Sequence, residues 1–158
     1  MSREILFKAK QKNWRELPKE GWWLKGYYVY EYNKNAHWIL SNEPSTCLNA
    51  GSKVHRSDFI LEPYEIDPET LCQYIGKDDK RGSQICEHDV ISISTYSYDE
   101  PESDYYGEVV YAEGWACWCI QQLEEKRPIP LCECEGSYLT EITIEGNAID
   151  NPELLEEV

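Results

Sequence analysis

Residues 66–93, IDPETLCQYIGKDDKRGSQICEHDVISI, contain the signals that decide the expected fold. Asp67 stands where a helix N-cap belongs, and Pro68 follows at the first helical position, where its fixed φ and missing N–H suit a helix start. Gly76 is a typical residue at which a helix ends. The pattern therefore predicts a short helix that begins at Pro68 and runs to about residue 73.

The second half of this stretch predicts a tight turn followed by a strand. Residues 77–82, KDDKRG, are polar and finish on Gly82, as tight turns commonly do. Residues 90–95 then alternate apolar and small polar side chains, which is the pattern of a half-buried strand beginning after Asp89.

Further strands are expected on both sides of this stretch. The segments rich in alternating, β-branched or aromatic side chains are residues 3–10, 22–32, 37–40, 107–112, 115–121 and 138–145. The acidic segment 96–106, which contains Pro101, is expected to be an exposed loop. Near the end of the chain, Asn151 and Pro152 repeat the cap-and-proline start of a short helix.

These signals predict a mainly β fold, α+β by element count, with two short helices. We expect two lobes with a boundary near residue 65. Residues 1–65 would form an N-terminal strand and hairpin lobe that is aromatic-rich and mildly basic. Residues 66–158 would form a core with the helical turn, further strands and a C-terminal helix.

The charge is unevenly distributed along the chain. The first 60 residues carry ten Lys or Arg against six Asp or Glu, whereas the remaining 98 carry five against 24. A chain with a net charge of −15 disfavours nucleic acid and anionic membranes as partners. The acidic part could instead imitate nucleic acid for a basic partner, or simply keep the protein in solution.

The sequence predicts a cytoplasmic protein. Residues 1–12 are basic without an apolar run, and the most apolar stretch, WWLKGYYVY at 22–30, is short and interrupted by Lys25. Neither a signal peptide nor a membrane-spanning segment is therefore expected. In that compartment the seven cysteines would be reduced thiols.

Three motifs together resemble the YopX family of phage and prophage proteins. They are DPETLCQYIG at residues 67–76, DKRGSQICEHDVI at 79–91 and GNAIDNPELL at 146–155. REILFKAK and GYYVY in the N-terminal part also fit the resemblance. His88 departs from the pattern, because the family usually has Gly before Asp89; we expect a left-handed backbone at His88, which His tolerates better than a β-branched residue does.

The resemblance implies a mostly β protein with a small SH3-like β-barrel built from the strands after Ile85. It also implies phage origin, and hence the cytoplasm of a bacterial host as the location. It supplies no catalytic residues, so function has to be sought in the side chains themselves.

Four cysteines form the one group with a metal-like composition: Cys117, Cys119, Cys132 and Cys134. If the two Cys-x-Cys segments pair as antiparallel strands with Trp118 opposite Glu133, all four thiols share one face. Structural zinc, however, usually takes its thiolates from Cys-x-x-Cys knuckles that curl round the ion. Zinc at this site and small buried thiols both remain open, and no other cofactor is expected.

No catalytic motif is present in the sequence. The three histidines, His37, His55 and His88, are far apart, and neither a Gly-x-Ser-x-Gly elbow, a His-Glu-x-x-His pair nor a Gly-rich phosphate loop occurs. We therefore expect a protein that is not an enzyme.

Aromatic and basic residues are concentrated in the predicted N-terminal hairpin. The candidate ligand-binding residues are Trp22, Trp23, Tyr27, Tyr28, Trp38 and Arg56. Such side chains could stack a base and pair a phosphate, or they could form the core or an oligomer contact.

The sequence thus predicts a homo-oligomeric phage accessory protein that acts by binding, in counter-defence, on a nucleotide-like signal or a host protein. The alternative is an acidic DNA mimic or a nucleic-acid-directed regulator. For the accessory protein that acts by binding, no direct contact with nucleic acid or membrane is expected.

Overall fold

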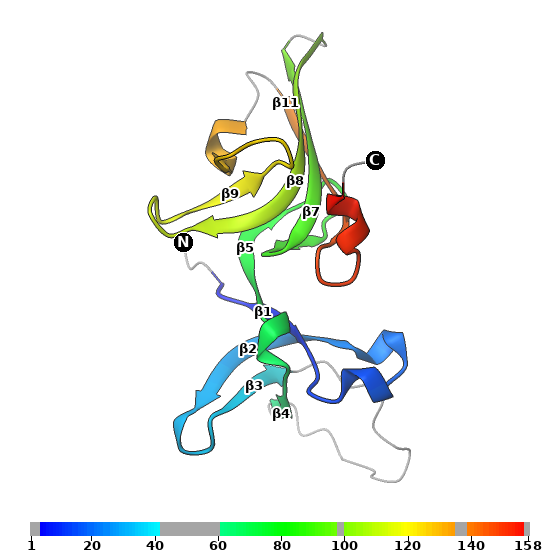
Figure 1. The fold of residues 1–158 in the computed structure, drawn as a ribbon, viewed down its shortest axis with the longest axis vertical. Helices are drawn as coiled ribbons and strands as arrows, with labels where there is room; N and C mark the ends of the chain where they lie inside the picture. The colour runs from blue at the N-terminus through cyan, green and yellow to red at the C-terminus, as the bar shows by residue number, and fades with distance from the viewer. Residues whose placement is uncertain (1–3, 42–60, 98–99, 135–138, 157–158) are drawn as a thin grey trace. The chain divides into compact units, whose positions relative to one another are not determined.

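Antiparallel strands dominate the residues that the computed structural model describes, which are 4–41, 61–97, 100–134 and 139–156 (Figure 1). In that part of the chain every strand pair is antiparallel, and every helical segment is a short 3-10 helix. The mainly β fold class is therefore confirmed. The chain divides into two units, Met1–Gln73 and Tyr74–Val158, so the division falls later than residue 65, within strand β5 (Cys72–Asp78).

The N-terminal unit is a curled sheet whose strands β1–β4 pair in sequence order. The strands are β1 (Phe7–Lys10), β2 (Trp23–Glu31), β3 (Ala36–Ser41) and β4 (Glu62–Glu65). A bridge between Gln11 and Ile66 ties the end of β4 back towards the end of β1. The inner face of this sheet buries Ala9, Leu24 and Ile39 together with Ile66.

Only a single 3-10 turn, η4 (Pro68–Thr70), forms where the sequence predicted a helix reaching residue 73. Asp67 does cap it, because its side chain accepts a hydrogen bond from the Glu69 N–H at 3.2 Å. The predicted helix length is wrong because Cys72 and Gln73 pair with β1 and become the start of β5.

Gly76 lies inside β5 instead of ending a helix. Its φ of 84° is left-handed, and the register between β5 and β6 (Gln84–Cys86) shifts between Tyr74 and Asp78. A glycine in this conformation is typical of a β-bulge. Gly82, with φ 80°, lies in the turn between β5 and β6, as predicted.

The C-terminal unit contains a five-stranded sheet in the order β10-β9-β8-β7-β11. Its strands are β7 (Asp89–Ser97), β8 (Glu100–Ala112), β9 (Cys117–Gln121), β10 (Ile129–Pro130) and β11 (Leu139–Asn147). The core is built mainly of isoleucines, including Ile85, Ile91, Ile93 and Ile120.

Two expectations for this unit are wrong. Most of segment 96–106 belongs to the long hairpin of β7 and β8 and is not an exposed loop (Figure 1). The polar sequence of this segment shows no strand pattern, so the strands were not predicted. Pro101 is accommodated next to the register shift between Thr95 and Tyr96, where the ladder is already irregular.

The described residues also form no closed barrel in this unit, because β10 and β11 are the two edges of its sheet and do not pair with each other. β10 is only two residues long and contains Pro130, which cannot donate to a further strand. The chain then turns into η5 (Leu131–Cys134).

The second predicted helix is the 3-10 helix η6 (Pro152–Leu155). Asn151 precedes it but makes no cap hydrogen bond to the backbone; its Nδ2 donates instead to Glu153 Oε1 at 3.2 Å. Within the described segments, no helix has the length and apolar character needed to cross a membrane.

At Gly26, β2 passes very close to the backbone of β3. A Cβ at this position would collide with the Leu40 carbonyl oxygen and approach Ile39 Cγ2 to 3.1 Å. We expect Gly26→Ala to lower the free energy of unfolding by about 2 kcal/mol, because backbone atoms cannot move aside as a side chain can. Urea denaturation would measure this.

Gly114 provides the matched control, because a Cβ there would meet nothing within 4 Å. Gly114→Ala should leave the stability nearly unchanged. Equal effects of the two substitutions would contradict the close approach at Gly26.

Candidate functional site

The outer face of the N-terminal sheet combines basic and aromatic side chains. Because residues opposite each other in an antiparallel pair share a face, Lys8 lies beside Lys25 and Val29 lies beside Trp38. Alternation along β2 places Tyr27 between Lys25 and Val29. We call Lys8, Lys25, Tyr27, Val29 and Trp38 the basic aromatic face.

Three hydrogen-bond donors of this face have no partner among the described residues: Lys25 Nζ, the Tyr27 hydroxyl and Trp38 Nε1. Lys25 and Tyr27 are exposed, so water can serve them. The indole N–H of Trp38 is buried. An unsatisfied buried donor costs about 1–3 kcal/mol. A ligand whose acceptor formed a hydrogen bond with this N–H would therefore gain binding free energy.

A tryptophan cluster encloses the fully buried Lys10 at the end of β1. Lys10 Nζ lies 3.7 Å from the ring centroid of Trp14 and 4.5 Å from that of Trp22, and the Trp23 ring is 5.4 Å away. Desolvated cation–π contacts of this kind stabilise by about 2 kcal/mol. The ammonium group of Lys10 thus takes the place on these rings that the cation of a ligand could have used. The cluster therefore has a structural role.

Five of the six predicted ligand-binding residues lie in the described part of the chain, and they fall into three groups. Trp23, Tyr27 and Trp38 lie on the outer face of the sheet, whereas Tyr28 points to the inner face, where its hydroxyl bonds His37 Nδ1 at 2.7 Å. Burial raises the pKa of Tyr28. Trp22 belongs to the Lys10 cluster.

Arg56 lies outside the described residues. Lys10 and Trp14, by contrast, carry contacts that the sequence reasoning missed. The alternation in FKAK, which places Lys8 and Lys10 on the same face, was the available signal.

The two Cys-x-Cys segments do not pair with each other, so the condition for four thiols on one face is not met. β9 pairs with Ile129–Pro130, with Pro130 opposite Cys119, and the segment that contains Cys132 and Cys134 is the 3-10 helix η5. The ladder stops at Pro130, before the second pair of cysteines is reached. Within the described residues, no three side chains of His, Cys, Asp or Glu are grouped so that they could hold a metal ion.

Two thiols of this region, those of Cys119 and Cys134, are poor nucleophiles. Burial raises the pKa of Cys119 to about 12 and that of Cys134 to about 11. Cys117 Sγ lies 3.7 Å from Cys119 Sγ, which adds to the first shift. Since the thiolate is the reactive form, both groups are inert near neutral pH.

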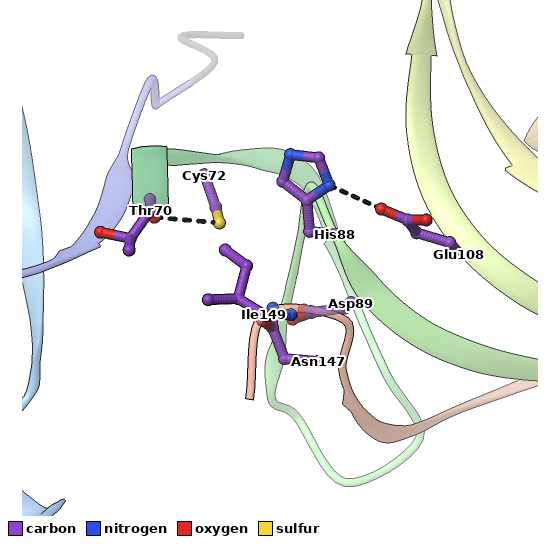
Figure 2. A network of polar contacts seen from close by, with 7 residues as sticks. All are labelled: Thr70, Cys72, His88, Asp89, Glu108, Asn147 and Ile149. Carbon is purple, nitrogen blue, oxygen red and sulfur yellow. Dashed lines mark hydrogen bonds and ion pairs between the residues drawn. The ribbon is translucent and has the colours of Figure 1, made fainter. Parts of the chain in front are cut away.

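The motif residues of the C-terminal unit form a buried polar network (Figure 2). The carboxylate of Asp89, which is 1% exposed, accepts from the Cys86 N–H at 2.7 Å and from Asn147 Nδ2 at 3.0 Å. Asn147 Oδ1 in turn accepts from the Ile149 N–H at 2.9 Å. The network joins two motifs that are more than 50 residues apart and holds the fold together; it contains no exposed reactive group.

His88 lies beside this network in the left-handed conformation predicted for it, with φ 66°. Its Nδ1 is 2.6 Å from Glu108 Oε1, and Figure 2 shows the ring pointing towards that carboxylate. The hydrogen bond to Glu108 raises the pKa of His88. When it is protonated, His88 thus forms an ion pair with Glu108.

The structure therefore defines a two-unit antiparallel β protein with a basic aromatic face and motif residues that serve the fold. A family model described as YopX protein matches residues 12–156, so the chain belongs to the YopX family. None of the curated proteins is similar enough to count as a match.

We expect Asp89→Ala to lower the free energy of unfolding by about 3 kcal/mol, because two buried donors would lose their acceptor. Urea denaturation followed by tryptophan fluorescence would report it. Glu113→Ala, at an exposed turn position, is the control and should have little effect. Similar stabilities for the two variants would show that the network does not support the fold.

The raised pKa of His88 predicts a pH dependence. Its contribution to stability is fully present below the unperturbed pKa of 6.5 and is lost as the pH rises through the higher folded-state value. The stability difference between the wild type and Glu108→Gln should therefore shrink as the pH rises from below 6.5 through the higher folded-state pKa of His88. Thermal unfolding in matched buffers measures it, and a constant difference would contradict the ion pair.

Proposed function

We propose that this YopX-family protein is a phage-encoded accessory protein that acts by binding, and that it sequesters a small nucleotide-like signal on the basic aromatic face. The proposal places it in the cytoplasm of a bacterial host, in counter-defence. One observation carries it: Lys25 and the exposed ring of Tyr27 share a sheet face with Trp38, whose buried indole N–H has no hydrogen-bond partner among the described residues.

Each of these groups matches a different part of a nucleotide. An aromatic ring stacks on a base of any identity, with a gain of about 1–3 kcal/mol. An ammonium group pairs with a phosphate. A hydrogen bond from the buried N–H of Trp38 to an acceptor such as a base carbonyl would satisfy this donor and add to the binding free energy.

The charge distribution favours a small ligand over a polymer. Residues 1–73 hold ten basic and ten acidic side chains, and residues 74–158 hold five against 20. The net charge of −15 repels a polyanion, whereas one or two phosphates can be held by local cations alone.

The hairpin also exposes aromatic rings on its other face, which supports a homo-oligomer. Tyr30 and Tyr32 are 43% and 84% exposed, while Tyr27 and Val29 are exposed on the outer face. Aromatic side chains are enriched at protein interfaces. A second copy packed on the hairpin would turn the open basic aromatic face into a deeper pocket.

Thermal unfolding across a panel of mononucleotides, cyclic dinucleotides and NAD tests the proposal. A ligand at 100 times its dissociation constant should raise the melting temperature by several degrees, equivalent to about 2.7 kcal/mol. Lys25→Gln and Trp38→Phe should each weaken the binding about tenfold, since each removes one donor.

Lys126→Gln, at an exposed cation of the other unit, changes the net charge in the same way as Lys25→Gln and should leave binding unchanged. A panel that leaves the melting temperature of the wild type unaltered would remove the nucleotide proposal. Native mass spectrometry of the same samples reports subunit number, and a monomer with and without ligand would remove the oligomer.

A further inference from the structure

The C-terminal unit contains a groove of about 730 Å³ between the segment that follows β9 and the C-terminal helix η6. Tyr106, Leu123 and Leu154 are the apolar residues that line it. Leu123 is 44% exposed, so its side chain offers apolar surface within the groove. Four glutamates also line the groove, Glu124 and Glu125 from the segment after β9 and Glu153 and Glu156 from the region of η6.

Two glycines allow the walls of this groove to form. A Cβ at Gly107 would collide with the Gln121 carbonyl oxygen, and a Cβ at Gly146 would collide with Leu154. The Tyr106 hydroxyl on β8 donates a hydrogen bond to the Leu154 carbonyl oxygen on η6 at 3.4 Å. The groove is therefore part of the packing of the sheet and does not depend on a chance arrangement of exposed side chains.

The charge of the groove is not neutralised from within. None of its four glutamates forms an ion pair with a lysine or arginine in the described residues. The unit as a whole carries five basic residues against 20 acidic ones, so its field reinforces that of the groove.

We propose that this groove docks a basic, amphipathic peptide segment of a partner protein. Arginine or lysine side chains would reach the glutamates on the two walls, while aliphatic side chains and the methylene stems would cover Leu123 and Tyr106. A metal ion fits less well, because the described carboxylates do not converge in any group of three.

This inference does not depend on the nucleotide site, which belongs to the other unit. A failure to bind nucleotides would not affect the groove proposal. A failure to bind the peptide would likewise not affect the nucleotide proposal. The inference assigns a binding role to one acidic surface of the C-terminal unit and defines the chemistry of its partner.

Fluorescence anisotropy of a labelled synthetic peptide, in which arginines alternate with leucine and alanine, tests the docking on the full chain. We expect Glu125→Gln/Glu153→Gln to weaken binding about fivefold at low salt, since each exposed ion pair contributes up to about 1 kcal/mol. Leu123→Ala should weaken it about threefold through lost apolar burial. Raising the salt concentration should reduce the electrostatic part.

Matched variants separate the groove from the general charge. Asp104→Asn/Glu113→Gln alters the net charge of the unit equally at exposed positions outside the groove, and Leu139→Ala removes an equally exposed leucine on β11. Both should bind the peptide as the wild type does. Equal weakening by the two acidic double variants, or displacement of the peptide by spermine with no effect of Leu123→Ala, would overturn the proposal, because binding would then be simple cation condensation.

Discussion

The carboxylate of Asp89 is the constraint on which the C-terminal unit depends. It sits at the start of β7, and its two oxygens receive the Cys86 N–H and the Asn147 amide. A buried carboxylate is tolerated only where its lone pairs are satisfied. The end of β11 and the turn before β7 must therefore stay together, and this in turn places His88 beside Glu108 and η6 beside Gly146.

The N-terminal unit has a comparable junction around Asp67. The Asp67 N–H donates to the Lys10 carbonyl oxygen, the Thr70 hydroxyl accepts from the Lys10 N–H, and Trp14 Nε1 donates to Asp67 Oδ2 at 3.2 Å. The motif that begins at Asp67 thus fixes the end of β1 and the tryptophan cluster together. The basic aromatic face is held on strands whose ends are secured in this way, which suits a binding surface.

The candidate site was only partly predictable from the sequence. Trp23, Tyr27 and Trp38 could be chosen because aromatic residues cluster with lysines in a strand pattern. That Tyr28 faces the core follows from the strand alternation only once the inner face is known. The enclosure of Lys10 could not be predicted, because Trp14 reaches it from a connection whose sequence specifies no regular element, and Trp22 lies just before β2 instead of in the strand predicted for it. The acidic groove was equally hidden, since its walls are about 30 residues apart in the chain.

Local patterns in the sequence determined the mainly β class, the strands β2, β3, β7 and β11, the cap at Asp67, the left-handed His88 and the separation of charge along the chain. These follow from side-chain alternation and backbone preference, which act over a few residues. The tertiary structure alone decided that residues 72–73 extend instead of coiling, that the polar segment 100–106 is strand, and that Cys132 and Cys134 leave the sheet. In each case hydrogen bonding to a distant strand, or its loss at a proline, outweighed local preference.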